Sequence, residues 1–266
     1  MKNALIFAAG LGTRLRPLTN DRPKALVEVN GKPLLQHNIE KLRDAGFDCI
    51  VVNVHHFGQQ IIDFLHAHRN FGIDIRVSDE RDLLLDTGGG LLRALSMFDD
   101  DSPVLVHNVD IVSQADVRAL YDDHVALSNR MAQSGGELGA SLMVNQRQTS
   151  RYLLFDGDLR LRGWKNIQSG ETRGDGSAPQ MRAFSGIHVV SRALINYLKE
   201  YSSTCSTQDS SRPAGSPSPV NPFAIIPFYL WVCQRVAVQG VEMPRDVKWV
   251  DCGKVESLTK AAEILL

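Results

Sequence analysis

Short apolar runs alternate with segments of helical periodicity through the first half of the chain. The apolar runs predict buried strands at residues 4–9, 49–54, 73–77 and 104–106. Apolar residues at helical spacing follow each run and predict helices at residues 33–46, 59–68, 88–98 and 115–127. Repeated strand–helix units favour a doubly wound α/β fold with a parallel sheet, in which ligands bind at the carboxyl ends of the strands.

The second half of the chain is less regular. Its apolar segments predict further strands at residues 139–144, 151–155, 183–190 and 248–251, and helices at residues 222–232 and 255–265. The polar stretch 164–182 predicts a long loop. Segment 202–220 is dense in Ser, Thr, Pro and Gly, a composition that buries little apolar surface, so we expect a mobile surface insertion there. The strands of this half predict a mixed extension of the sheet.

Composition limits the kinds of partner. The 266 residues are 43% hydrophobic, enough for a substantial core, and carry a formal net charge of -1. Such a balance gives no electrostatic basis for binding nucleic acid or an anionic membrane, so we expect neither as a partner and any phosphate site must be local. Scattered cysteines without a Cys-x-x-Cys pair fit a reduced compartment, and the first apolar run is too short to span a membrane. We therefore expect a cytoplasmic protein.

The most informative stretch follows the first predicted strand. Small residues and two glycines there let backbone N–H groups approach a triphosphate closely, and two basic side chains add positive charge. The nucleotide-binding candidates in this stretch are Ala8, Ala9, Gly10, Gly12, Thr13, Arg14 and Lys24. Two glycines alone would fit a simple tight turn equally well. The stretch is neither a Walker loop nor the full Gly-x-Gly-x-x-Gly of dinucleotide folds.

With these residues, segment 8–33 resembles the signature of the sugar-1-phosphate nucleotidyltransferases. Further motifs occur in the order seen in that family, at residues 86–90, 108–111, 184–187 and 249–253. Within the family, the chain most resembles the short N-acetylmuramate-1-phosphate uridylyltransferases. The resemblance implies a GT-A-like fold with a Rossmann-like, doubly wound mixed sheet in three α/β/α layers. It also implies one domain, 1–266, with a nucleotide-binding half at 1–130 and a sugar-binding half at 131–266.

The resemblance further implies a reaction and its central residues. A sugar-phosphate oxygen attacks the α-phosphorus of a nucleoside triphosphate (NTP), pyrophosphate leaves, and a nucleotide sugar forms. Asp110 and Asp251 are the expected ligands of Mg²⁺, which accepts a few carboxylates together with phosphate oxygens and water. Arg14 is expected to hold the triphosphate, and Lys24 the α-phosphate and the sugar phosphate. Without such context, an aspartate after a strand would be a cap or turn residue.

Other candidates surround that centre. Three glycines could approach the nucleobase or ribose at a helix N-terminus, although a plain helix start explains them as well: Gly88, Gly89 and Gly90. The family's best-known members carry a Glu-Lys-Pro tripeptide whose lysine meets the sugar phosphate, and this chain has Gly-Trp-Lys-Asn at 163–166 instead. The candidates for the sugar pocket are Asn108, Lys165, Ser185 and Gly186.

Several functions fit these residues. We expect UTP as the donor and N-acetylmuramate 1-phosphate as the acceptor, in a monomer or small homo-oligomer. The same chemistry with mannose, heptose or glucose 1-phosphate, or with phosphocholine, stays open, as does the identity of the base. From other classes, a non-catalytic nucleotide-sugar-binding protein and a glycosyltransferase remain alternatives. The intact set of basic and acidic residues argues against the first, and the lack of an Asp-x-Asp element at 108–110 against the second.

Overall fold

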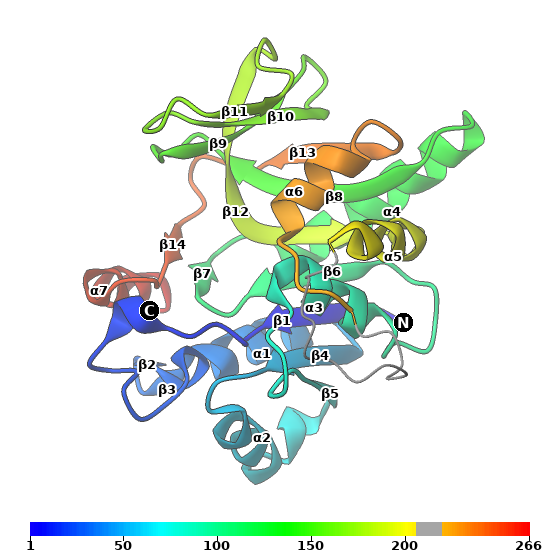
Figure 1. Cartoon of the computed structure of the whole chain (residues 1–266). Coiled ribbons are helices and arrows are strands. Elements are labelled where there is room, and N and C mark those ends of the chain that lie inside the picture. The colour runs from blue at the N-terminus through cyan, green and yellow to red at the C-terminus, as the bar shows by residue number, and fades with distance from the viewer. Residues whose placement is uncertain (206–219) are drawn as a thin grey trace.

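The computed structural model describes residues 1–205 and 220–266 (Figure 1). The predicted mobile insertion, 202–220, is therefore covered only at its ends, and residues 206–219 lie outside the described part. At its start the prediction is wrong, because Ser202 is a buried residue of helix α5 (Leu194–Thr204). Its hydroxyl oxygen accepts a hydrogen bond from the Asn221 amide at 3.1 Å, which satisfies a polar side chain that composition alone assigned to solvent.

Four parallel strands form one end of the sheet, in the order β6-β1-β4-β5. They are β1 (Asn3–Phe7), β4 (Cys49–Val54), β5 (Asp74–Asp79) and β6 (Val104–Asn108). The register pairs Phe7 with both Asn53 and Asn108, which brings the carboxyl ends of three strands together at one edge. The predicted parallel sheet and its four strands are confirmed.

Antiparallel strands from the second half extend the same sheet. β12 (Gln180–Val190) pairs antiparallel with β6, β8 (Leu138–Asn145) and β9 (Arg151–Phe155), and β13 (Ala237–Glu242) runs parallel to β8. Together with β10 (Leu161–Asn166) and β11 (Thr172–Gly174), they complete a ten-stranded sheet within the described residues. The strands β9 to β11 form the top of the molecule in Figure 1. The predicted mixed extension is confirmed.

The prediction of a long loop over 164–182 is wrong. These residues contain the end of β10, all of β11 and the start of β12. Every position of β11 is exposed, so the strand gives no hydrophobic alternation, and backbone pairing with β10 defines it instead. A solvated hairpin of this kind cannot be distinguished from a polar loop by side-chain pattern.

Helices cover both faces of the parallel strands and produce three layers. On one face, α1 (Leu34–Asp44), α2 (Gly58–Ala67) and α4 (Val117–Gln133) pack around Ala4 and Ile6 of β1. On the other face, α3 (Asp86–Leu95), α5 and α6 (Ile225–Val232) pack around Leu5. Successive strand residues point to opposite faces, which explains why neighbouring residues of β1 belong to different cores. The three-layer prediction is confirmed, and α5 is a helix that the sequence pattern did not predict.

A small unit at the carboxyl edge joins residues 15–34 and 111–113 to the C-terminal segment 249–265. β7 (Ile111–Ser113) pairs antiparallel with β14 (Trp249–Asp251), and α7 (Val255–Ile264) lies beside the hairpin of β2 (Glu28–Val29) and β3 (Lys32–Pro33). Short 3₁₀ helices occur at η1 (Thr13–Leu15), η2 (Lys24–Leu26) and η3 (Arg69–Gly72). A separate apolar core of Leu15, Val27, Val250 and Ala261, among others, holds this unit together. It fixes the end of β14 against the segment that follows β1.

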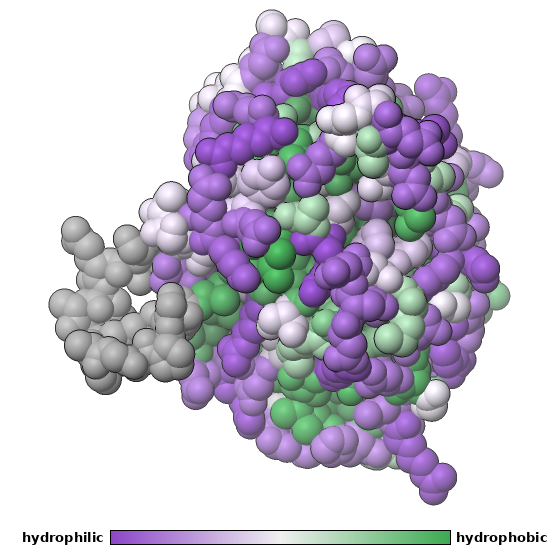
Figure 2. All heavy atoms as spheres, turned by 90° about the vertical axis from the view of Figure 1, so that its right-hand side faces the viewer, coloured by the Kyte–Doolittle hydropathy of each residue, from purple (hydrophilic) through white to green (hydrophobic). Residues whose placement is uncertain are grey.

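The right-hand side of Figure 1 faces the viewer in Figure 2, and hydrophilic residues cover most of that face, with smaller hydrophobic patches between them. Within residues 1–205 and 220–266, no helix combines the length and the apolar character that crossing a membrane requires.

Candidate active site

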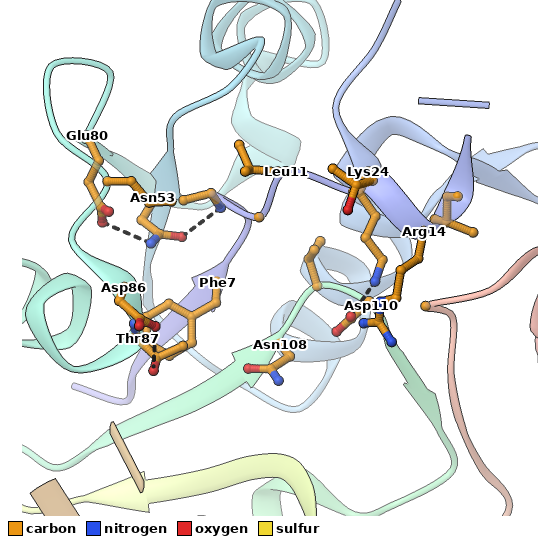
Figure 3. Close-up of a pocket in the computed structure, with 18 of the residues that line it drawn as sticks. Phe7, Leu11, Arg14, Lys24, Asn53, Glu80, Asp86, Thr87, Asn108 and Asp110 are labelled. Atoms are coloured by element: carbon orange, nitrogen blue, oxygen red, sulfur yellow. Dashed lines mark hydrogen bonds and ion pairs between the residues drawn. The ribbon is translucent and has the colours of Figure 1, made fainter. Parts of the chain in front are cut away.

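A cleft of about 660 Å³ opens at the carboxyl edge of the parallel strands (Figure 3). Ligands of doubly wound sheets bind at this edge. The loop after β1, the loop before α3 and the end of β6 form its walls. The predicted nucleotide-binding residues that line it are Ala9, Gly10, Gly12, Thr13, Arg14 and Lys24. Most of the glycine-rich stretch therefore lies where a nucleotide would enter.

The loop after β1 depends on a glycine at position 12. Gly12 has a φ of +64°, and a Cβ atom there would lie 3.1 Å from the Cβ of Lys24 and 3.2 Å from the Cγ2 of Thr19. The Thr19 hydroxyl donates a 2.9 Å hydrogen bond to the Gly12 carbonyl and holds the turn. Both the left-handed backbone and the close packing disfavour a side chain at this position.

Lys24 and Asp110 form an ion pair at one end of the cleft (Figure 3). Lys24 comes from η2 and is buried, and Asp110 follows the end of β6, so the fold joins two distant parts of the chain here. Each charge neutralises the other in the protein alone. A buried ammonium facing a cleft is suited to bind a phosphate oxygen when one arrives.

The second predicted carboxylate, Asp251, lies beside the first. In the β7–β14 ladder Asp251 is opposite Ile111, and the amide of Cys252 donates to the Asp110 carbonyl at 2.8 Å. The Oδ1 atom of Asp251 is buried and has no hydrogen-bond partner among the described residues. A buried carboxylate oxygen without a donor is costly unless a cation or a proton completes it.

Arg14, from η1, reaches the same place. A Cβ atom on Gly253 would lie 2.7 Å from Oδ1 of Asp251 and 3.0 Å from Nη2 of Arg14, so both groups pack directly against this glycine. Any side chain at position 253 would displace one of them. The structure thus brings Arg14, Lys24, Asp110 and Asp251 together, as the sequence motifs predict, and their chemical roles stay a prediction.

Asn53, at the end of β4, holds the loop after β1 in place, and the sequence pattern does not predict this role. Its Oδ1 atom accepts hydrogen bonds from the amides of Ala8 and Ala9, at 2.7 Å and 3.2 Å. Those two amides are therefore occupied within the protein. Ala9 still lines the cleft, and the nucleotide contact expected for Ala8 and Ala9 stays a prediction. A single Asn at the end of a strand carries no sequence signal that would reveal this contact.

Glu80 continues the same network and was also missed. Its Oε1 accepts from Nδ2 of Asn53 at 2.9 Å (Figure 3). Its Oε2 accepts from the Leu85 amide at 3.1 Å. Glu80 is fully buried, and burial raises the pKa of its carboxyl above the ordinary value. Asn53 and Glu80 thus connect the loop after β1 to the loop that leads into α3.

The three glycines at the start of α3 have packing partners rather than a place in the cleft. The amides of Gly88 and Gly89 both donate to the Phe223 carbonyl, at 2.8 Å and 3.3 Å. A Cβ atom on Gly88 would lie 2.3 Å from the Phe223 ring, and one on Gly90 would lie 3.0 Å from Oε1 of Glu80. None of the three glycines lines the cleft, and the amides of Gly88 and Gly89 are used within the protein, so the expected nucleotide contact of Gly88, Gly89 and Gly90 stays a prediction that this packing does not support. From this motif, Asp86 and Thr87 line the cleft instead.

The sugar-pocket candidates divide in a similar way. Asn108 lines the cleft, and Gly186, with a φ of +81°, packs against it, since a Cβ there would lie 2.9 Å from Nδ2 of Asn108. Ser185 is buried, and its hydroxyl oxygen accepts from the Ile187 amide at 3.2 Å. Lys165 lies on β10 and is not among the residues that line the cleft. The structure therefore brings Asn108 and Gly186 together, and leaves Ser185 and Lys165 out of the cleft lining.

The fold and the cleft define a class: α/β proteins with a cleft at the carboxyl edge of a doubly wound sheet. Residues 3–152, more than half of the chain, match the family model described as nucleotidyl transferase, and the chain belongs to this family.

Known relatives agree with this assignment. The chain is 49% identical over 113 residues to the N-acetylmuramate alpha-1-phosphate uridylyltransferase of Caulobacter vibrioides, covering 42% of this chain and 46% of that protein. It is 38% identical over 129 residues to the enzyme of the same name from Neisseria meningitidis, covering 48% and 55%. The matched region thus spans about half the length of these relatives. Among solved structures, UDP-glucose pyrophosphorylase complexed with UDP-glucose shares the fold, with a TM-score of 0.71 at 18% identity over 100% of this chain and 98% of that one.

Proposed function

We propose that this protein transfers a uridylyl group from UTP to N-acetylmuramate 1-phosphate, releasing pyrophosphate and forming a nucleotide sugar. The observation that carries the proposal is the junction of Lys24, Asp110 and Asp251 at one end of a cleft that begins at a glycine-rich loop. Family membership supports the reaction type. The names of the two bacterial relatives support the choice of substrates.

The loop and the two basic residues would hold the triphosphate. The amides of Gly10, Leu11 and Gly12 donate to no acceptor within the described part of the chain, so they remain available for phosphate oxygens. Arg14 adds charge at the side of Asp251, where the leaving pyrophosphate can be neutralised. Lys24 exchanges Asp110 for phosphate oxygens when the two anionic substrates meet. In this proposal, Asn108 and Gly186 belong to the acceptor side.

Asp110 and Asp251 fit a divalent cation, and we propose Mg²⁺. The buried, unpartnered Oδ1 of Asp251 has the environment of a ligand atom, and the backbone of β7 and β14 fixes Asp110 next to it. Within the described residues, no group of three or more His, Cys, Asp or Glu could hold a metal, which suits an ion that keeps phosphate and water ligands. When bound, such an ion would neutralise charge on the reacting phosphates.

A substrate grid tests the proposal. Pyrophosphate release is measured with Mg²⁺ for the four common ribonucleoside triphosphates and dTTP against the 1-phosphates of N-acetylmuramate, N-acetylglucosamine, glucose and mannose, and against phosphocholine. The highest kcat/KM is expected for UTP with N-acetylmuramate 1-phosphate. A higher value for another pair would replace the substrates and keep the chemistry. No turnover in any pair, with a folded protein that still binds a triphosphate, would favour a non-catalytic binding protein.

A further inference from the structure

We propose that Arg147 binds an oxyanion of the acceptor, either its 1-phosphate or a carboxylate carried on the sugar. The inference rests on the proposed function, because it requires a sugar phosphate beside Asp251. Arg147 lies in the loop after β8, which runs parallel to β6 because both pair antiparallel with β12. The loop therefore emerges at the same carboxyl edge as the cleft. None of the sequence motifs contains this residue.

Contacts on two sides hold Arg147 in place. Its Nη2 donates to the Phe184 carbonyl at 2.8 Å, and its guanidinium carbon lies 4.5 Å from the centre of the Trp249 ring. Trp249 is itself fixed, because its Nε1 donates to the Ser185 carbonyl at 2.9 Å. A guanidinium held by stacking and by one carbonyl loses little freedom when it binds a ligand, since its orientation is already set.

Arg147 also has positive charge that the protein leaves unused. No salt bridge among the described residues includes it, and burial is the main effect on its pKa, which is lowered from the ordinary value. The charge of Asp251 acts in the opposite direction, without a hydrogen bond between the two groups. A half-buried cation without a carboxylate partner is costly unless an anion completes it.

Arg147 lies next to the part of β14 that carries Asp251, one of the two proposed metal ligands. Trp249 and Asp251 are two residues apart on this strand, so their side chains lie on the same face, about 7 Å apart along it. Arg147 stacks on the first of these and is in electrostatic reach of the second. An acceptor that binds on that face, with its 1-phosphate next to Asp251, can therefore contact the guanidinium through that phosphate or through a carboxylate on its sugar.

Arg147 and Trp249 also line a second cavity, of about 540 Å³. Its lining contains two more cations, Arg245 and Lys260, and one acid, Glu242, which already forms an ion pair with Arg182. Positive charge thus predominates on this side of Asp251. An acceptor that carries negative charge is the ligand that such a cavity favours.

A cation on the acceptor side would share the neutralisation of the acceptor with Lys24. Arg14 and Lys24 both line the first cleft with the glycine-rich loop, where the triphosphate would bind. Lys165, the residue that the sequence suggests for the sugar phosphate, is absent from that lining. Arg147 supplies a cation at the acceptor side from a different element, the loop after β8.

Steady-state kinetics of Arg147→Gln and Arg147→Lys test the inference. In Arg147→Gln, the KM for the acceptor is expected to rise about 10- to 100-fold, the loss typical of one charged hydrogen-bonded contact, while the KM for UTP changes less than about twofold. Arg147→Lys is expected to recover part of the loss, because it restores charge without the planar stack. An unchanged KM for the acceptor, or equal increases in both KM values, would overturn the inference.

Arg235→Gln is the matched control. Arg235 also stacks on a tryptophan, 3.8 Å from the Trp231 ring centre, but pairs with Glu200 and lies outside both cavities described above. Its kinetic constants are expected to match the wild type. If the kinetic constants of Arg235→Gln equal those of the wild type, losing an arginine–tryptophan stack does not by itself raise the KM for the acceptor.

Two acceptors distinguish the sources of the oxyanion. N-acetylmuramate and N-acetylglucosamine 1-phosphates differ by one carboxylate-bearing ether, so Arg147→Gln weakens both equally if Arg147 binds the phosphate. It weakens only the first if Arg147 binds the carboxylate.

Calorimetric titration of both acceptors into the wild type and Arg147→Gln needs no turnover. A wild type that binds an acceptor at least tenfold more tightly than the variant supports the inference even if no pyrophosphate is released and the proposed function fails. Equal affinities, or no binding to the wild type, would contradict it.

Discussion

At the scale of single residues, Asp251 carries a carboxylate oxygen that the protein does not satisfy. Its Oδ1 is buried without a hydrogen-bond donor in the described structure, and a second carboxylate, Asp110, lies beside it. Isolated burial of such a group lowers the stability of the folded state. A residue that costs stability and remains in place is typical of a site arranged for a ligand.

Substitution of Asp251 by Asn therefore separates activity from stability. The change removes one charge from the proposed metal site, and kcat is expected to fall at least about 100-fold. The melting temperature is expected to stay equal or to rise, because the amide removes a buried charge next to Asp110.

Pyrophosphate release and thermal unfolding measure the two effects. Asp246→Asn, an exposed change in the loop before β14, serves as the control. Wild-type turnover in Asp251→Asn would refute the role assigned to this carboxylate.

At the scale of elements, Asn53 and Glu80 determine how the loop after β1 lies relative to α3. Asn53→Ala leaves the amides of Ala8 and Ala9 without their acceptor and the Oε1 atom of Glu80 without its donor. Unfolding free energy is expected to fall by about 2–4 kcal/mol, and the KM for UTP to rise, because the loop loses its anchor. Urea unfolding and steady-state kinetics measure both, with the exposed Asn196→Ala as the control. Stability equal to the wild type would show that the network does not hold the loop.

The start of α3 allows a sharper test of packing. Gly88→Ala would place a Cβ atom 2.3 Å from the Phe223 ring and 2.8 Å from the Phe223 carbonyl, so the segment before α6 has to move. A loss of about 1–3 kcal/mol is expected, as for other overpacked sites. The matched change Gly157→Ala has no atom within 4 Å of the new Cβ and is expected to be neutral. Thermal unfolding of both variants checks this, and equal melting temperatures would contradict the packing role.

Sequence pattern predicted the elements whose side chains are sorted by burial, such as β4 and α1. It failed at β11, where every position is exposed and backbone pairing alone defines the strand. In the site, Arg14, Lys24, Asp110 and Asp251 could be found because each belongs to a recognisable motif. The part played by Ala8 depends on Asn53, a partner far away in sequence. Local pattern contains no information about such a contact.

At the scale of the whole molecule, three buried histidines make stability depend on pH. Burial lowers the pKa of His107 and His124 to about 4 and that of His188 to about 3. Their pKa in the unfolded chain is about 6.5. The unfolded state therefore binds more protons than the folded state as the pH falls below about 6.5, and stability is lost in that range. The raised pKa of Glu80 acts in the opposite direction, for one group only.

Unfolding free energy is expected to decrease between pH 7 and pH 5 by up to about 1.4 kcal/mol per pH unit for each histidine. Urea unfolding at a series of pH values measures the slope. His188→Leu removes one of the three groups and is expected to reduce the slope below that of the wild type. A profile that is flat over this range would contradict the assignment of these histidines as neutral in the folded protein.

The ladder between β7 and β14 unites Asp110 and Asp251, which come from distant parts of the chain. During synthesis, the ribosome releases the glycine-rich loop, Lys24 and Asp110 long before it releases Asp251. Lys24 and Asp110 are thus present in the growing chain before the second carboxylate is. Under the role proposed for Asp251, a chain truncated before β14 is expected to lack transfer activity even where it still binds a triphosphate.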